Sequence, residues 1–282
     1  MKARALGIDV AVRPGKGLDL VLMDDHRVPF AIVPRAGRDD VERIVREWQP
    51  EIVGVDAPPR WATSGRSRRT ENELAALNVH AFRTPSEDHA TGRQFDWIRE
   101  GIALFELLAA LGYPLATSGP YRGSAIEVFP HASAAVLAGC LSPSGLHKKA
   151  WRERVLRMQG VRTEELRTLD QVDAALAALT GVLVLAGRHF APGDPREGTI
   201  VLPASAPAPK YRPGTIDAAA GDRLFTWCAC GTCDRQIPAG REFAPGHDAK
   251  RKSVLWQAVR AGHDATRELM RRGWEAPPET TD

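Results

Sequence analysis

The sequence contains few cysteines and no long hydrophobic run. Of the four cysteines, three are clustered at residues 228–233, which in a reducing compartment indicates a metal site rather than disulfides. The longest apolar stretch, residues 174–187, is too short and too rich in alanine to cross a bilayer, and the amino terminus lacks the hydrophobic region of a signal peptide. The formal net charge is only +3, so charge alone does not indicate a nucleic-acid partner. We therefore expect a soluble cytoplasmic protein without a membrane partner, and nothing in the composition indicates its oligomeric state.

The first third of the chain has the hydrophobic pattern of four strands and one helix. Short polar breaks separate the first three apolar runs, which favours hairpins and hence antiparallel neighbours. The fourth run is almost wholly apolar, which is typical of a central strand buried on both faces. The expected strands are residues 5–12, 18–23, 28–33 and 51–56, and the expected helix is residues 39–48.

The middle of the chain has mainly helical periodicity, and a Pro/Ala-rich segment follows it. We expect helices at residues 66–77, 94–111, 147–159 and 169–188, a strand at 125–129 and a late edge strand at 199–202. The chain then divides into a domain of residues 1–203, a linker of residues 204–221 and a small module of residues 222–282. This element order is typical of a ribonuclease H-like α/β fold, a mixed sheet of about five strands flanked by helices. Actin-like phosphotransferases begin similarly.

Four aspartates lie at positions where a charge is costly unless it is paired or bound to a cation. Asp9 is the only charge inside the first strand, and Asp56 ends the apolar fourth strand. Asp170 and Asp173 open the last long helix, three residues apart on one face. Carboxylates that converge at strand ends form a site of hard oxygen ligands, which suits Mg²⁺ or Mn²⁺. Taken singly, each acid is more simply a turn residue or, for Asp170, a helix cap.

Several spaced motifs resemble one known family. They are GIDVA at residues 7–11, VGVDAPP at 53–59, RRTENEL at 68–74, IEVFPHA at 126–132 and DQVDAALAAL at 170–179. In this order they look like domain-of-unknown-function family 429, which is described as predicted nucleases of ribonuclease H-like fold, over about residues 1–203. The last motif is also similar to the final helix of Holliday-junction resolvases, where two acids three residues apart complete a metal site. The resemblance implies that Asp9, Asp56, Asp170 and Asp173 bind the catalytic metal.

The chemistry implied is two-metal hydrolysis of phosphodiester bonds in DNA or RNA. We also assign Glu127 to the catalytic site because the resemblance includes EVFP, although strand alternation leaves a solvent-facing position open. His131 has either a structural or a catalytic role. Trp61 and Trp97 are either core residues or platforms for stacking bases.

Substrate contacts are expected from basic residues outside the acidic site. Arg68 either contacts phosphate or forms an internal salt bridge with Glu71, three residues later. Lys148 and Lys149 begin a basic helix that either follows a nucleic-acid backbone or is simply solvated.

The last sixty residues contain a candidate zinc site and many positive charges. Cys228, Cys230 and Cys233, followed by His247, supply three thiols and an imidazole, a full tetrahedral set for structural Zn²⁺; His263 is the alternative fourth ligand. Residues 235–272 carry nine Lys or Arg and four acids, and the densest part contains Lys250, Arg251 and Lys252. Such a module can deliver an enzyme to nucleic acid, or it can bind a protein.

The sequence therefore predicts a metal-dependent nuclease whose zinc module assists substrate binding. The alternative from another class is a catalytically idle adaptor that binds nucleic acid or protein. An actin-like phosphotransferase ranks last because the sequence offers at best one glycine-rich phosphate-binding turn.

Overall fold

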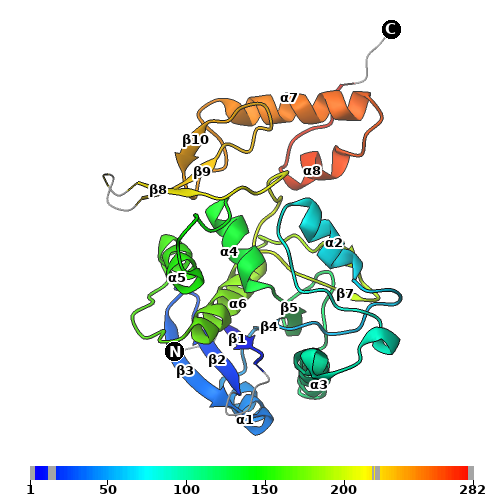
Figure 1. Ribbon diagram of the computed structural model, residues 1–282, viewed down its shortest axis with the longest axis vertical. Helices are drawn as coiled ribbons and strands as arrows, with labels where there is room; N and C mark the ends of the chain where they lie inside the picture. The colour runs from blue at the N-terminus through cyan, green and yellow to red at the C-terminus, as the bar shows by residue number, and fades with distance from the viewer. Residues whose placement is uncertain (1–3, 12–16, 218, 220–222, 279–282) are drawn as a thin grey trace.

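The computed structural model describes residues 4–11, 17–217, 219 and 223–278 (Figure 1). Its centre is a five-stranded sheet in the order β3-β2-β1-β4-β5. The strands are β1 (Ala5–Asp9), β2 (Leu18–Met23), β3 (Pro29–Ala36), β4 (Ile52–Asp56) and β5 (Ser124–Glu127). β2 is antiparallel to β1 and β3, whereas β4 is parallel to both β1 and β5. The predicted mixed ribonuclease H-like sheet with three antiparallel strands at one side is confirmed.

Six helices of the first domain agree with the predicted pattern, with one exception. They are α1 (Arg38–Trp48), α2 (Arg69–Ala76), α3 (Asp96–Ala110), α4 (Pro130–Ala138), α5 (Lys148–Met158) and α6 (Leu169–Leu185). The sequence did not predict α4, because most of its small residues are buried and it has no polar face to produce an amphipathic pattern. Pro130 begins this helix, where its fixed φ and missing N–H cost nothing.

Helix α6 lies directly on the central strands and positions one face of the functional site. Every residue from Gln171 to Val184 is buried, so packing surrounds this helix on all sides. The approach is close because β1 and β4 carry glycines beneath it. A Cβ on Gly7 would lie 1.9 Å from the carbonyl oxygen of Ala174, and one on Gly54 would lie 2.6 Å from that of Ala177. Helices α4 and α5 pack with α6 on this face, while α1 and α3 contribute to the core on the other face.

The carboxy-terminal module contains a three-stranded sheet and two helices, and it lies above α4 in Figure 1. Its elements are β8 (Thr215–Asp217), β9 (Arg223–Trp227), β10 (Gln236–Pro238), α7 (His247–Arg260) and α8 (Thr266–Arg271). Strand β8 falls within the segment predicted as linker, so that boundary is wrong. Two contacts join this region to the first domain. Pro213 forms a β-bridge with Leu141, and the hydroxyl of Thr226 on β9 donates to the carbonyl of Gly139.

Two further predictions differ in detail from the structure. The late edge strand is reduced to β7 (Gly198–Thr199), which pairs with β6 (Gly193–Asp194), and to single bridges at Ile200 and Leu202. Val12, which was expected to end the first strand, lies outside the described residues, as does most of the turn that follows it.

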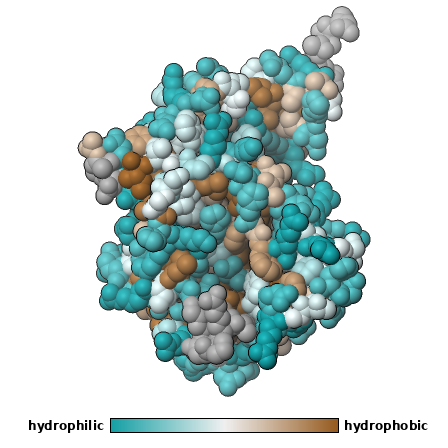
Figure 2. Space-filling model, in the orientation of Figure 1, coloured by the Kyte–Doolittle hydropathy of each residue, from teal (hydrophilic) through white to brown (hydrophobic). Residues whose placement is uncertain are grey.

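The surface is mostly hydrophilic on the face shown in Figure 2, with hydrophobic residues gathered in a central band between the regions of α4 and α2. Within the described parts of the chain, no helix combines the length and hydrophobicity that a membrane span needs.

Candidate functional site

Three aspartates from three elements meet at one end of the central strands. Asp9 ends β1 and Asp56 ends β4, and the parallel register pairs these two residues directly. Asp173, in the second turn of α6, lies beside them because the helix crosses both strands. Each carboxylate places an oxygen within 4.8 Å of the other two. The sequence placed these acids correctly, and their mutual distances fit a divalent cation with shared oxygen ligands.

The pKa values of this acidic cluster (Asp9, Asp56 and Asp173) show how costly its negative charges are without a cation. Burial, followed by repulsion from Asp56 and Asp173, raises the pKa of Asp9 to about 10. Burial and the charge of Asp173 raise the pKa of Asp56 to about 8, although Arg152 opposes this. Burial raises the pKa of Asp173 to about 6 against the opposing charge of Arg152. The cluster therefore retains protons at neutral pH unless a positive charge replaces them.

Asp170 lies at the margin of the cluster. It lines the adjoining cleft, and its charge adds to the repulsion felt by Asp9 and Asp173. The alternative reading as a helix cap is wrong, because Thr168 occupies the N-cap position and its hydroxyl accepts a hydrogen bond from the backbone of Gln171. The carboxylate of Asp170 therefore lies beside the site and does not cap the helix.

Arg152 is the main site residue that the sequence did not single out. It lies on α5 with 7% exposure, and its guanidinium donates to both carboxylate oxygens of Asp173. Its Nε has no hydrogen-bond partner among the described residues. The sequence places Arg152 in a basic helix whose face can simply be solvated, because no local pattern shows that Arg152 faces α6. In the structure it supplies the positive charge nearest the three carboxylates.

An open cleft of about 1150 Å³ adjoins the acids. Arg35 and Arg93 line it, together with Trp97 on α3, and both arginines are exposed. Phe82, which is 53% exposed, packs edge-on against Trp97 with ring centroids 5.4 Å apart, and it lines a small adjoining cavity with Asp56. The sequence offers stacking as one of two roles for Trp97, but it does not single out Arg35, Phe82 or Arg93, because none of them belongs to a recognisable motif. Cations and an exposed aromatic ring therefore lie next to the carboxylates.

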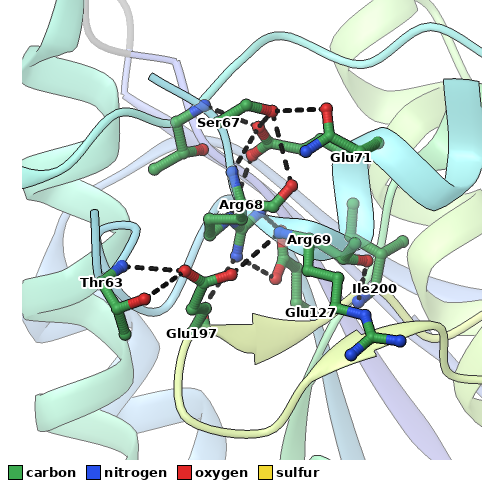
Figure 3. A network of polar contacts seen from close by, with 11 residues as sticks. Thr63, Ser67, Arg68, Arg69, Glu71, Glu127, Glu197 and Ile200 are labelled. Atoms are coloured by element: carbon green, nitrogen blue, oxygen red, sulfur yellow. Dashed lines mark hydrogen bonds and ion pairs between the residues drawn. The ribbon is translucent and has the colours of Figure 1, made fainter. Parts of the chain in front are cut away.

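Arg68 and Glu127 form a structural ion pair rather than parts of a catalytic site (Figure 3). The guanidinium of Arg68 is bonded at 2.5 and 2.7 Å to the two carboxylate oxygens of Glu127 and at 3.0 Å to Glu71. Arg68 is 1% exposed and Glu127 is 3% exposed. The predicted phosphate contact by Arg68 is therefore wrong, and the internal salt bridge is correct. Glu127 is not part of the acidic cluster, because its oxygens point to Arg68, so its predicted catalytic role is not supported.

The remaining basic and aromatic candidates of the first domain lie in different environments. Lys148 is exposed, whereas Lys149 pairs with Glu153 on the same helix. Burial and the charges of Arg152 and Lys148 lower the pKa of His131 to about 4, so its ring is neutral at physiological pH. That ring packs against Trp151, which favours the structural role for His131. Trp61 lies under the guanidinium of Arg99, 5.8 Å from it.

The predicted zinc ligands also converge. Cys228, Cys230, Cys233 and His247 place ligand atoms within 4.8 Å of one another. The Nδ1 atom of His247 lies 3.5 Å from the sulfur of Cys228 and 3.4 Å from that of Cys233. Burial raises the pKa of the Cys230 thiol, but hydrogen bonds from Thr232 outweigh it and lower the value to about 6. Three thiols and one imidazole at these distances fit tetrahedral zinc.

The basic run after the cluster is less available for nucleic acid than its sequence suggested. Lys250 is exposed, and Lys252 lies 4.8 Å from the ring of Trp256. Arg251 is 8% exposed, and its guanidinium donates to both oxygens of Glu268 at 3.0 and 2.6 Å. The predicted substrate contact by Arg251 is therefore wrong, because this residue joins α7 to α8.

Comparison with solved structures finds similarity to the RuvC of Thermus thermophilus. One match is that protein "in complex with Holliday junction substrate", with 14% identity and a TM-score of 0.32 over 65% of this chain and 93% of that one. A second RuvC structure from Thermus thermophilus gives 15% identity and a TM-score of 0.31 over 65% and 96%.

Comparison with curated proteins finds no match. A family profile described as "Protein of unknown function (DUF429)" matches residues 7–197. The matched region contains the whole five-stranded sheet from β1 residue Gly7 onward and the three clustered aspartates. Because it covers more than half of the sequence, this chain belongs to the DUF429 family.

Proposed function

We propose that the protein is a metal-dependent nuclease that hydrolyses phosphodiester bonds of nucleic acid. The observation that carries this proposal is the convergence of Asp9, Asp56 and Asp173, whose oxygens lie within 4.8 Å of one another at the end of the sheet. Among the described residues, one arginine pairs with this cluster, and it binds only Asp173, so Asp9 and Asp56 are left without a cationic partner. Hard oxygen ligands of this kind favour Mg²⁺ or Mn²⁺.

Asp9, Asp56 and Asp173 would hold one or two such ions, and Asp170 would lie at the margin of the site. When bound, the metal would lower the pKa of a water molecule and stabilise negative charge on the scissile phosphate. The residues around the site orient the substrate. Arg35 and Arg93 are placed to bind phosphates that flank the reacting one, since both line the cleft and are exposed.

The exposed ring of Phe82 adds a preference for unpaired bases. Its edge rests on Trp97, which fixes the ring beside the cleft, and more than half of its surface faces solvent. An exposed aromatic ring of this kind is a stacking platform for a base that has left a duplex. This arrangement favours single-stranded or distorted nucleic acid over a regular duplex.

The carboxy-terminal module would be held together by structural Zn²⁺ at Cys228, Cys230, Cys233 and His247. Its exposed Lys250 and the exposed Lys148 of α5 remain candidates for contacts with the substrate backbone. The zinc site would contribute folding energy rather than chemistry, because all four ligand positions come from the protein.

A binding adaptor without turnover is the second candidate. The observation that favours it is the ion pair between Arg152 and Asp173, which neutralises one of the three carboxylates without a metal. An adaptor would bind nucleic acid equally well with and without Mg²⁺, and it would retain that binding when the acids are replaced.

The experiment that tests these functions is cleavage of labelled single-stranded, duplex, hybrid and branched substrates with Mg²⁺ or Mn²⁺. We expect the wild type to cleave, and we expect Asp9→Asn and Asp173→Asn to lose at least about a hundredfold in rate, since each removes a metal ligand. Asp25→Asn, an exposed acid on the β2–β3 turn, is the matched control and should cleave like the wild type. Equal cleavage by all four proteins would mean that the activity does not belong to this site. Binding without cleavage on every substrate would favour the adaptor.

A further inference from the structure

A second cavity of about 460 Å³ lies between the first domain and the carboxy-terminal module. Its walls come from α4, from residues 204–211, from β9 and residues 240–243, and from residues 271–274 at the end of α8. None of the clustered aspartates and none of the proposed zinc ligands lines this cavity. This interdomain cavity has a volume within the range of about 300–1,000 Å³ that small-molecule sites occupy.

The lining of the interdomain cavity is strongly positive. Four arginines contribute to it against one carboxylate, that of Glu242, and the arginines are Arg188, Arg241, Arg271 and Arg272. Glu242 is already paired with Arg272. Among the described residues, the other three arginines form no ion pair. Burial and the nearby charge of Arg27 lower the pKa of Arg188, and burial and Arg267 lower that of Arg271. Glu268 and Glu73 act on the charge of Arg271 without forming an ion pair with it, so the lining of the cavity carries more positive than negative charge.

Arg272 is built into the wall of the cavity and retains an unused donor. Its side chain is 7% exposed and is fixed by ion pairs with Glu242 and Glu268. Its Nη2 atom is buried without a hydrogen-bond partner among the described residues. A buried N–H group without an acceptor is costly, and such groups are rare in folded proteins. The buried charge of Arg272 adds to the positive potential of the cavity wall.

Aromatic rings stand beside these arginines. Trp227, Phe243 and Trp274 all line the cavity and are half-buried. The guanidinium of Arg272 lies 5.3 Å from the ring centre of Phe243 and 5.2 Å from that of Trp274, so charge and rings form one continuous wall. The lining also contains several small residues of the segment 204–208, which take up little of the cavity.

We propose that the interdomain cavity binds a nucleoside phosphate, with the phosphate on the exposed Arg188 and Arg271 and the base against Trp227 or Trp274. Arginine is well suited to this task because its planar guanidinium pairs with phosphate and stacks on rings. The volume matches a mononucleotide or the terminal nucleotide of a strand. Because the ligand would touch both the first domain and the module, its binding would stabilise their packing.

This site is independent of the proposed nuclease chemistry. It shares no lining residue with the acidic cluster, so binding should persist without added Mg²⁺ or Mn²⁺ and in the Asp9→Asn variant. Loss of cleavage and loss of nucleotide binding are therefore separate outcomes.

The test is isothermal titration calorimetry of the full chain with four probes: AMP, a 5′-phosphorylated tetranucleotide of deoxyadenosine, adenosine and inorganic phosphate. We expect AMP or the tetranucleotide to bind, and adenosine and phosphate to bind at least about tenfold more weakly, because each lacks one half of the recognised group. Binding of AMP identifies a free nucleotide as the ligand, and binding of the tetranucleotide alone identifies the end of a strand. Failure of both to bind at millimolar concentration would overturn the proposal, as would phosphate binding as tightly as AMP.

Variants at the exposed arginines complete the test. Arg188→Gln and Arg271→Gln should each weaken binding by about tenfold, because each removes a charged contact with phosphate. Arg260→Gln is the matched control, since Arg260 is exposed on α7 and does not line the cavity. Circular dichroism and bound zinc should be unchanged in all three. Equal weakening by the control would mean that binding follows general charge and would refute the site.

Discussion

Replacing Asp9 with asparagine should stabilise the protein in the absence of added Mg²⁺ or Mn²⁺, even though it removes a proposed metal ligand. Asp9 is 8% exposed, and its pKa rises from 3.8 to about 10 through burial and the neighbouring acids. At neutral pH it is therefore protonated in the folded state and ionised in the unfolded state. Asparagine mimics the protonated carboxyl in size and can still donate a hydrogen bond to Asp56.

The magnitude follows from proton linkage. Between the unfolded pKa near 4 and the folded pKa near 10, the folded wild type holds one more proton at Asp9 than the unfolded chain does. Its stability therefore falls as pH rises through this window, by about 1.4 kcal/mol per pH unit from Asp9 alone. The asparagine variant lacks this loss. From pH 6 to pH 8 the stability of the variant relative to the wild type should increase by about 2.7 kcal/mol.

Urea denaturation at pH 6, 7 and 8 without added Mg²⁺ or Mn²⁺ measures this difference. Titration of the rest of the chain contributes to both proteins, so the difference between the two curves reports Asp9 together with the change that its replacement causes in the titration of its neighbour Asp56. Asp25→Asn, on the exposed β2–β3 turn, should follow the wild type at every pH. Parallel stability curves for the wild type and Asp9→Asn would refute the inference that repulsion and burial suppress the ionisation of Asp9.

Three other predictions concern packing and the second metal site. Gly7→Ala should lower the free energy of unfolding by about 3 kcal/mol or more and weaken Mn²⁺ binding, because its Cβ would overlap the backbone of α6. Gly37→Ala is the control, since its Cβ would meet no atom nearer than 4.0 Å, and thermal melts and Mn²⁺ titration measure both variants. Arg68→Met should lower the free energy of unfolding by about 3–5 kcal/mol, because it leaves Glu127 buried without a partner. The neighbouring change Arg69→Met removes only an exposed ion pair and should change the urea midpoint little; equal losses for the two variants would contradict this. By metal analysis, Cys230→Ser should bind less than about half an equivalent of zinc. Cys140→Ala, which removes a buried thiol outside the cluster, should retain one equivalent, and zinc retained by Cys230→Ser would contradict the ligand set.

Much of the fold follows from hydrophobic periodicity in the sequence. The β2 strand was predicted at its observed bounds, because five of its six residues are apolar. The helix predicted at residues 39–48 begins only one residue earlier in the structure, because it has one buried face. Helix α4 was missed because its alanines give no amphipathic signal. Strand β8 was missed because a short strand beside several prolines has the composition of a linker, and only its pairing with β9 reveals it.

The candidate site was predictable where the chemistry lies at the ends of regular elements. Asp9, Asp56 and Asp173 could be grouped because strand order and helix spacing place them without knowledge of side-chain contacts. Arg152 and Glu127 could not be placed in this way. Whether a charge on an element faces the site or a buried partner depends on its rotamer and on contacts from distant segments, and these are tertiary facts without a local pattern.

The structure of α6 explains why the acidic cluster persists despite its repulsion. Gly7 and Gly54 let this helix approach the strands closely, and the packing of α4 and α5 against it keeps it there. Asp173 is therefore held near Asp9 and Asp56 by the core and not by any attraction among the carboxylates. The core offsets the cost of the buried acids, and Arg152 pairs with Asp173 and lowers the pKa of Asp56 without removing the rise. A site preformed in this way needs little rearrangement when a cation binds, and it loses stability for as long as none is bound.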